Sequence, residues 1–286
     1  METGKRIIIT GGGSGLGKHM AYDLLSRGYE VAVSYAHSKK QAEELRERAE
    51  AQLGKKLFIY HADFNQKDAM KNFFDAAVEA LGGVDLMVNN SADTSAGFEV
   101  FDITDENLDA MYAVNFRSGV IAMREAGKYM AEHGIKGSII NISSIHGRMV
   151  WPADAVYGAF KAGWERIIRS FALSLAPYDV RINCIALGAF RNKTLEEAVA
   201  SGSTPEAYHG RDNMARGKIA LRRLGEPKDL VELLLFLASE KATYITGETV
   251  TIDGGISIPC IPEGKPVDGK PIPWAAVKPR DFGREG

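Results

Sequence analysis

Short apolar runs alternate along the chain with longer stretches of helical pattern. The runs expected to form strands are Arg6–Thr10, Glu30–Tyr35, Leu57–His61, Val84–Asn89, Ser138–Ile142, Arg181–Ile185 and Glu248–Ile252. The stretches expected to form helices are Leu16–Arg27, Lys39–Leu53, Gln66–Leu81, Asp105–Glu132, Asp154–Ala176 and Pro227–Ala238. Strand–helix alternation of this kind predicts a parallel sheet that is covered by helices on both faces. We therefore predict an α/β fold with a single doubly wound parallel sheet of strand order 3-2-1-4-5-6-7.

Two segments depart from this alternation. Residues 188–225 are polar and partly helical in pattern, and they leave the carboxyl edge of a strand, where open α/β sheets place their ligands. We predict that they form a substrate loop within one dinucleotide-binding and catalytic domain, residues 1–255. Residues 256–286 form a Pro-rich C-terminal extension, because six of the ten prolines fall within 257–286. Its apolar residues favour packing on its own or a neighbouring subunit, and a disordered extension is the alternative.

Composition narrows the function classes. The 286 residues are 45% apolar and carry a formal net charge of −2, so no basic field recruits nucleic acid or an anionic membrane. Two cysteines cannot build a disulfide framework, and the six histidines show no metal-binding spacing. No signal peptide or membrane span is visible. We expect a cytoplasmic protein that binds no metal, nucleic acid or membrane.

A glycine-rich loop, Thr10-Gly-Gly-Gly-Ser-Gly-Leu-Gly17, follows the first strand and opens the first helix. A strand–turn–helix unit of this kind brings backbone N–H groups and the positive end of the helix to a pyrophosphate, as in Rossmann-like folds. Glycine permits the turn and the close approach of the phosphate. We predict that this loop binds a dinucleotide through Gly11, Ser14, Leu16 and Gly17.

The end of the second strand bears on the choice between NADP and NAD. An acidic residue usually lies there to bind the adenosine ribose, yet Ser34–Lys40 contains none. The predicted cofactor contacts in this segment are Tyr35, Ala36, His37 and Ser38. Lys39 and Lys40 either attract a 2′-phosphate or belong to a solvated helix start. NADP is favoured, and NAD stays open because no arginine is present to bind the phosphate.

Tyr157 and Lys161 are spaced to lie on one helix face, and Ser144 precedes Tyr157 by 13 residues, in the loop before the helix. A phenol, an ammonium group and a hydroxyl in this arrangement suit proton transfer to or from an alcohol or carbonyl oxygen. A cation close to a phenol lowers its pKa from about 10 toward neutral pH. We therefore expect Lys161 to lower the pKa of Tyr157.

Together these motifs resemble the short-chain dehydrogenase/reductase family over residues 5–255. The resemblance rests on the glycine-rich loop and on residues in the family's order: Asp63, Asn89-Asn90, Asn115, Ser144, Tyr157 and Lys161. It implies that Tyr157 is the acid/base, that Lys161 also bonds the nicotinamide ribose, and that Ser144 bonds the substrate oxygen. It further implies that Asn115 anchors a water that links Lys161 to solvent.

The same resemblance implies cofactor contacts from Asp63 to adenine, from the Phe64 amide, and from Asn90 and Gly188. Three features depart from the family's pattern. Ser91-Ala92 replaces Ala-Gly, Leu187 replaces the Pro before Gly188, and no early Thr follows Gly188. These departures bear on the contacts with the nicotinamide.

Some stretches look closest to bacterial glucose 1-dehydrogenases, among them Ser143-Ser-Ile-His146 followed by Trp151-Pro152. His146 and Trp151 lie between the Ser and the Tyr, so both are candidate substrate contacts. The alternatives are that His146 bonds a loop carbonyl and that Trp151 fills an apolar gap. Sugars, cyclic ketones, steroids and keto-acyl compounds all remain candidate substrates, because Phe190 and Met214 suit a bulkier or more apolar molecule.

We thus predict an NAD(P)-dependent oxidoreductase that interconverts a secondary alcohol and a ketone, with Tyr157 as general acid/base. A non-catalytic NAD(P)-binding sensor or scaffold on the same fold is the alternative from another class. An epimerase or dehydratase would also use a Tyr/Lys pair, but the chain shows no clear second substrate domain. The resemblance further implies a homotetramer or homodimer, since the two longest helices form subunit contacts in the family.

Overall fold

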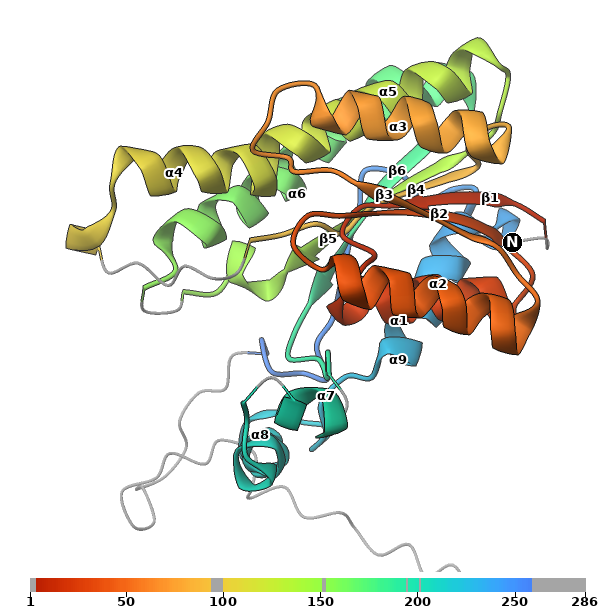
Figure 1. The fold of residues 1–286 in the computed structure, drawn as a ribbon. Coiled ribbons are helices and arrows are strands. Elements are labelled where there is room, and N and C mark those ends of the chain that lie inside the picture. Colours follow the sequence, from red (N-terminus) through yellow and green to blue (C-terminus); the bar gives the residue numbers. More distant parts are fainter. Residues whose placement is uncertain (1–3, 94–99, 151–152, 194, 201, 259–286) are drawn as a thin grey trace, which may run out of the picture.

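A parallel sheet organises the molecule (Figure 1). The computed structural model describes residues 4–93, 100–150, 153–193, 195–200 and 202–258. Within these ranges the sheet has seven strands in the order β3-β2-β1-β4-β5-β6-β7, and all neighbours pair in parallel, as predicted. The strands are β1 (Arg6–Ile9), β2 (Glu30–Tyr35), β3 (Leu57–His61), β4 (Leu86–Asn89), β5 (Ser138–Ser144), β6 (Arg181–Leu187) and β7 (Thr249–Ile252).

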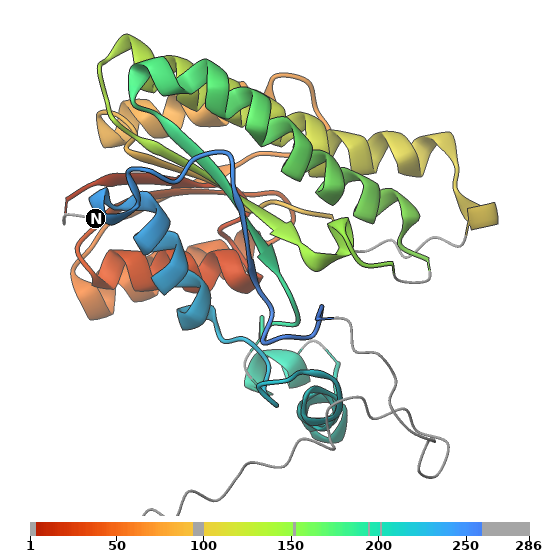
Figure 2. The same cartoon turned by 180° about the vertical axis from the view of Figure 1, so that it is seen from behind.

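Helices cover both faces of this sheet (Figures 1 and 2). One face carries α1 (Gly15–Ser26), α2 (Lys39–Leu53) and α9 (Pro227–Ala238). The opposite face carries α3 (Ala69–Leu81), α5 (Ser118–Glu132) and α6 (Ala155–Leu175), and α4 (Asp105–Tyr112) continues this layer beyond the sheet. The short helices α7 (Leu195–Ala200) and α8 (Pro205–Lys218) lie apart from both layers, at the carboxyl end of β6 (Figure 1).

Two apolar cores, one on each face, explain why the strands are almost continuous apolar runs. Alternate residues of β1 point to opposite faces, so Ile7 and Ile9 join the core under α1 and α9, while Ile8 joins the core under α3 and α5. All three isoleucine side chains are fully buried. Cys184 on β6 is buried in the second core, as expected for a small apolar side chain.

The predicted single helix Asp105–Glu132 is interrupted by a π-helical segment, η2 (Ala113–Arg117). The interruption lies at Asn115, whose main-chain carbonyl accepts a hydrogen bond from the Trp164 indole at 2.8 Å. The Asn115 side chain pairs with the main chain of Asp93, accepting from its N–H at 2.8 Å and donating to its carbonyl at 3.0 Å. These tertiary hydrogen bonds accompany the widened turn, and π-helical segments of this kind are frequent at functional sites.

Other boundaries differ by a few residues. β5 extends to Ser144, so this serine is the last residue of a strand and not part of a loop. The extension follows from pairing with β6, which itself continues to Leu187. The third helix begins at Ala69 and not at Gln66, because Asp68 adopts a left-handed backbone conformation with φ of 64°.

The segment 188–225 is partly helical, as predicted, and its two ends are joined. Arg191 N–H donates to the Gly225 carbonyl at 2.8 Å, and Gly225 N–H donates to the Ala189 carbonyl at 3.0 Å. Ala215, Ile219 and Leu224 form a small core of their own beneath it. Of the C-terminal extension, 256–258 is described; the expectation for 259–286 and that for Trp151 concern residues outside the described ranges.

Gly119 on α5 lies directly against Trp164 on α6. A Cβ atom at this position would lie 1.7 Å from the indole ring, so Gly119→Ala forces apart two helices that are packed around the Asn115 carbonyl. We expect Gly119→Ala to lower the free energy of unfolding by about 1–3 kcal/mol, the usual cost of overpacking. Urea denaturation measures this.

Gly217→Ala is the matched control. Gly217 also lies in a helix, but its added Cβ would meet nothing within 4 Å. Its substitution is expected to be neutral or to stabilise by up to about 1 kcal/mol. An equal loss of stability in both variants would contradict the packing argument.

Candidate active site

The glycine-rich loop crosses from β1 to α1 at the carboxyl edge of the sheet, and its shape depends on missing side chains. Gly11 has φ of 65°, a left-handed conformation that glycine adopts without strain. A Cβ on Gly17 would lie 2.2 Å from the Gly11 carbonyl oxygen, and one on Gly12 would lie 2.5 Å from the Val33 side chain. The loop therefore packs tightly on itself and on β2.

The start of α1 is arranged to receive an anion. Ser14 occupies the N-cap position without donating or accepting a capping hydrogen bond through its side chain, and the first turn contains no acidic residue. The N–H groups at this end thus face the cavity beside the loop, and the helix dipole favours negative charge there.

A cavity of about 570 Å³ opens beside this loop and brings most of the predicted cofactor contacts together. Its lining includes every predicted contact from the loop, from the end of β2 and from the residues after β3 and β4: Gly11, Ser14, Leu16, Gly17, Tyr35, Ala36, His37, Ser38, Asp63, Phe64 and Asn90. Ser91, Ala92, Asp93, Val114 and Asn192 also line it and were not predicted. Val114 belongs to the π-helical segment and Asn192 to the segment 188–225, so only the tertiary structure brings them here.

Asn90 has a structural task in addition to its place in the cavity wall. Its side-chain nitrogen donates to the carbonyls of Thr10 and Gly11 at 3.0 and 3.1 Å. The Thr10 hydroxyl in turn accepts from the N–H groups of Asn90 and Ser91 at 2.9 and 3.0 Å. These four hydrogen bonds fasten the glycine-rich loop to the end of β4.

At the end of β2 the cavity wall contains no carboxylate among the described residues, which agrees with the sequence analysis. The attraction suggested for Lys39 and Lys40 is not supported. Neither lines the cavity, and on the exposed face of α2 Lys39 lies 3.9 Å from Glu43 and Lys40 lies 3.8 Å from Glu44. Ser34, Tyr35, His37 and Ser38 are the polar side chains of the cavity wall at this end.

Ser144, Tyr157 and Lys161 are brought together by β5 and α6. The Ser144 hydroxyl lies close enough to the Tyr157 phenol to lower the pKa of the phenol by hydrogen bonding. Lys161 is 3% exposed, and its Nζ donates to the Ile142 carbonyl at 2.9 Å while lying 5.3 Å from the centre of the Tyr157 ring. The three side chains that were predicted from their spacing in the sequence therefore lie close together in the structure.

Two glycines allow this close arrangement. The short helix η3 (Ile145–Gly147) follows Ser144 and lies against the backbone of α6. A Cβ on Gly147 would lie 2.9 Å from the Ala162 nitrogen, and one on Gly158 would lie 2.8 Å from the His146 carbonyl oxygen. Larger residues at either position would push the serine away from the phenol.

The electrostatics of the pair differ from the expectation. Burial raises the pKa of Tyr157 to about 12, although the hydrogen bond with Ser144 lowers it, and the negative charge of Asp154 raises it further. Lys161 is not among the groups that shift the pKa of the phenol, and its Nζ donates to the Ile142 carbonyl. Burial also lowers the pKa of Lys161 to about 8.

A second cavity, of about 260 Å³, lies beside Ser144. Its wall is largely apolar, with Met149, Val150, Leu187 and Ile256, and its polar side chains are Ser144, His146 and Lys218. Gly188, a predicted cofactor contact, lines this cavity and not the one beside the glycine-rich loop. Tyr157 and Lys161 line neither cavity directly, and Ser144 links them to this one.

His146 lies against a carboxylate. Its Nδ1 lies 2.6 Å from Oδ2 of Asp154, the residue before α6. Its ring meets the Tyr157 ring edge-on, with centroids 5.9 Å apart and planes at 89°. Asp154 was not predicted from the sequence, although its position three residues before Tyr157 was a usable signal.

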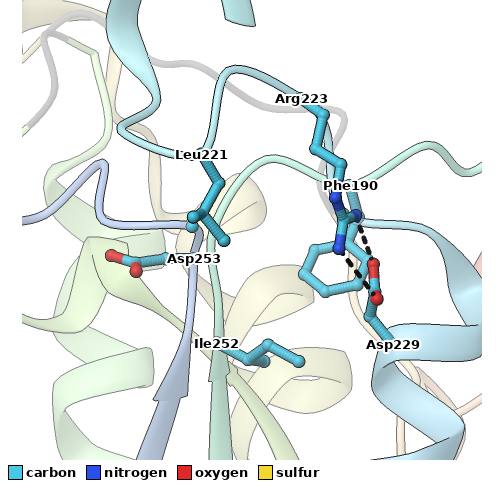
Figure 3. A pocket seen from close by; sticks show the side chains of 8 residues that line it. Phe190, Leu221, Arg223, Asp229, Ile252 and Asp253 are labelled. Carbon is cyan, nitrogen blue, oxygen red and sulfur yellow. Dashed lines mark hydrogen bonds and ion pairs between the residues drawn. The ribbon is translucent and has the colours of Figure 1, made fainter. Parts of the chain in front are cut away.

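A third cavity, of about 190 Å³, lies where the segment 188–225 meets β7 and α9 (Figure 3). Phe190, Leu221 and Ile252 supply its apolar wall. Arg223 and Asp229 close one side through two hydrogen bonds of 2.6 and 3.0 Å (Figure 3). Ser144 does not line this cavity. The Arg223–Asp229 pair joins the end of the segment 188–225 to α9.

Comparison with known proteins agrees with this geometry. A family model described as enoyl-(acyl carrier protein) reductase matches residues 11–257, which include the glycine-rich loop and the Ser–Tyr–Lys set. The chain belongs to the short-chain dehydrogenase/reductase family. This family binds NAD or NADP, and the tight glycine-rich loop, the uncapped start of α1 and the adjoining cavity fit such a dinucleotide.

The similar proteins act on different molecules. The chain is 32% identical to 3beta-hydroxysteroid dehydrogenase 1 of Eggerthella lenta over 259 residues, which is 89% of this chain and 94% of that protein. It is 30% identical to glucose 1-dehydrogenase of Gluconobacter oxydans, covering 89% and 92% of the two chains. A short chain dehydrogenase from Burkholderia cenocepacia J2315 in complex with NADP superimposes with a TM-score of 0.77 at 29% identity, covering 89% and 98%.

No group of His, Cys, Asp or Glu suited to holding a metal ion occurs among the residues that the structure describes. In the same part of the chain, every helix is too short or too polar to cross a membrane.

The buried ammonium group of Lys161 should lower the stability of the folded protein at neutral pH. Its ordinary pKa of 10.5 falls to about 8 in the folded protein, so between these values the unfolded chain binds a proton that the folded chain releases. Stability supplied by this group therefore rises with pH across that window. We expect Lys161→Met to remove about 1–3 kcal/mol of this rise, given 1.4 kcal/mol per pKa unit and partial relaxation around the charge.

Urea denaturation of the dinucleotide-free protein at pH 7.5 and pH 10 measures the difference. Lys128→Met is the control, because Lys128 is an exposed lysine on α5. A pH dependence that is the same in wild type and Lys161→Met would contradict the buried-charge argument.

Proposed function

We propose that this protein is an NAD(P)-dependent oxidoreductase that interconverts a secondary alcohol and a ketone, with Tyr157 as general acid/base. The observation that carries the proposal is that β5 and α6 bring Ser144, Tyr157 and Lys161 together, with Ser144 in the wall of the smaller, largely apolar cavity and a dinucleotide-sized cavity beside the glycine-rich loop. The alternative, a non-catalytic NAD(P)-binding sensor or scaffold, gives no chemical reason to bury a lysine beside a tyrosine.

The residues of the larger cavity would hold the cofactor. The N–H groups of the glycine-rich loop would bind the pyrophosphate, and Tyr35, His37 and Ser38 would surround the adenosine ribose. Asp63 accepts from the N–H and the side chain of Asn65, both at 3.0 Å, and would also bond adenine beside the Phe64 amide. NADP remains favoured over NAD, since no carboxylate at the end of β2 repels a 2′-phosphate.

The proton path follows from the pKa values. At neutral pH the Tyr157 phenol is protonated, because burial raises its pKa to about 12, so it is ready to donate a proton to a carbonyl oxygen. Ser144 would bond the same oxygen and hold it beside the phenol. Lys161 is charged below pH 8 and would bond the nicotinamide ribose. The cofactor, when bound, supplies or accepts the hydride.

The role proposed for Asn115, to anchor a water that links Lys161 to solvent, would use a second lone pair of its carbonyl, since Trp164 already donates to that oxygen. The Asn115 side chain is engaged with Asp93 and so contributes to the cavity wall indirectly.

The substrate cavity narrows the substrate without naming it. We propose that residues 188–225 form the substrate loop of a single domain, because Gly188, Ala189 and Lys218 line the cavity beside Ser144. Its mostly apolar wall suits a cyclic ketone, a steroid or a keto-acyl compound, while His146 offers a polar partner to a sugar. The similar proteins named above include both steroid and sugar dehydrogenases.

We also propose a homotetramer or homodimer. Tyr112 on α4 is 44% exposed, and its ring lies against those of Phe116 and Phe160 at centroid distances of 6.2 Å. These aromatic rings lie on the helices that form subunit contacts in the family, and a second copy would cover them.

Tyr157→Phe tests the catalytic role. Because the phenol is the proposed proton donor, we expect its loss to lower kcat by about 10²–10⁴-fold. Dinucleotide affinity, followed by nucleotide fluorescence, should change little. Tyr178→Phe is the control, since Tyr178 is exposed and remote from both cavities. Wild-type turnover by Tyr157→Phe on the true substrate would refute the assignment.

This test requires a substrate. A screen of sugars, steroids, acyl thioesters and cyclic ketones with both cofactors, followed by the absorbance of the nicotinamide, would identify one.

Tyr35→Asp tests the cofactor site. A carboxylate at the last position of β2 would accept hydrogen bonds from ribose hydroxyls and repel a 2′-phosphate. We expect the ratio of kcat/KM for NADP over NAD to fall by about tenfold or more, which corresponds to about 1.4 kcal/mol. Tyr35→Phe, which adds no charge, should leave the ratio unchanged. An unaltered ratio in Tyr35→Asp would place the adenosine ribose elsewhere.

A further inference from the structure

Asp154 lies at the start of a helix, but its side chain does not cap that helix. It occupies the N-cap position of α6, where an Asp side chain ordinarily accepts a hydrogen bond from the first turn. Here the side chain makes no capping hydrogen bond. Its Oδ2 lies instead 2.6 Å from Nδ1 of His146, and the carboxylate is only 14% exposed.

The backbone before Asp154 is bent to allow this contact. Ala153 has φ of 61°, a left-handed conformation that is unfavourable for alanine. A strained backbone persists where the surrounding structure holds it in place, and such residues gather at functional sites. The forgone cap and the strained residue both accompany a carboxylate that is directed at His146.

His146 passes the effect on to Tyr157. The imidazole ring meets the phenol ring edge-on at a centroid distance of 5.9 Å, and the main-chain N–H of His146 donates to the Ser144 hydroxyl at 3.2 Å. Gly158 gives room for this, since a Cβ there would lie 2.8 Å from the His146 carbonyl oxygen. The Asp154–His146 contact therefore fixes the ring that borders the phenol.

The charges around the phenol come from three elements. Asp154 and Lys161 are on its own helix, His146 is on η3, and Lys218 of α8 lines the adjoining cavity. Of these, Asp154 is the one whose charge raises the pKa of Tyr157. The Lys161 Nζ lies 5.3 Å from the centre of the phenol ring and donates to the Ile142 carbonyl.

We propose that Asp154 is a positioning residue that, through His146, holds Tyr157 in the orientation and the protonated form required to donate a proton to a substrate carbonyl. This rests on the proposed role of Tyr157. It adds a direction to that role, because a phenol kept protonated serves ketone reduction up to higher pH and delays alcohol oxidation to higher pH.

The test uses Asp154→Asn in the full-length protein, because asparagine keeps the shape of the side chain beside His146 while removing the charge. Tyrosine labelled with ¹³C at Cζ reports the titration of Tyr157 by NMR, with its signal assigned from Tyr157→Phe. We expect the titration to move to lower pH by at least about 0.3 unit, with and without NADP⁺, since a nearby like charge is removed.

Glu165→Gln is the matched control. Glu165 also lies on α6 and also ties the segment after Ser144 to this helix, with its Oε2 at 2.6 Å from Nε of Arg148. It is not among the groups that shift the pKa of Tyr157. Its substitution should leave the titration in place. A shift of equal size in both variants, or none in Asp154→Asn, would overturn the proposal.

Kinetics supply the second readout. In Asp154→Asn the rise of oxidation rate with pH and the fall of reduction rate with pH should both move to lower pH. Asp154→Ala, which also releases His146, should in addition lower kcat, whereas a purely structural role would lower stability without moving either pH limb. The NMR titration needs no turnover, so a failure of the proposed function, seen with Tyr157→Phe, is distinguishable from a failure of this inference.

Discussion

The close packing of the turn after β5 against the backbone of α6 is the constraint on which the site depends. Gly147 and Gly158 leave no room for a Cβ at this contact, and the packing brings the strand-end hydroxyl of Ser144 to the phenol of Tyr157. The strand is fixed by its register with β6, and the helix is fixed by its buried apolar face. Two rigid elements therefore hold the hydroxyl and the phenol, and a loop is not required to do so.

Burial favours the neutral form of both titratable groups, the Tyr157 phenol and the Lys161 ammonium group. It raises the pKa of the phenol and lowers that of the ammonium group. From the sequence alone, the spacing of Tyr157 and Lys161 predicts that the lysine lowers the pKa of the phenol. The structure adds that the ammonium group is held by a main-chain carbonyl and that a carboxylate lies on the other side of the phenol. A site with these costs is typical of a functional centre and not of a structural core.

The site has two halves, the cavity beside the glycine-rich loop and the cavity beside Ser144, and they are built from different kinds of segments. The glycine-rich loop, the strand ends and the helix start form one connected surface, and Asn90 fastens it together. The substrate half draws on the segment 188–225, on the turn after Ser144 and on Ile256, which lie far apart in the sequence. The chain is similar both to a steroid dehydrogenase and to a glucose dehydrogenase, so the family indicates the class of activity and leaves the substrate open.

The sequence by itself determined the sheet order, the two helical layers, the glycine-rich loop and the placing of Tyr157 beside Lys161, because these depend on local periodicity and on spacing along single elements. It could not predict the π-helical turn at Asn115, which accompanies hydrogen bonds to Trp164 and Asp93, both distant in the chain. Nor could it predict that His146 meets Asp154, or decide between the two roles left open for Lys39 and Lys40. Such outcomes depend on which side chains compete for the same polar partners once the layers have packed, and that competition exists only in three dimensions.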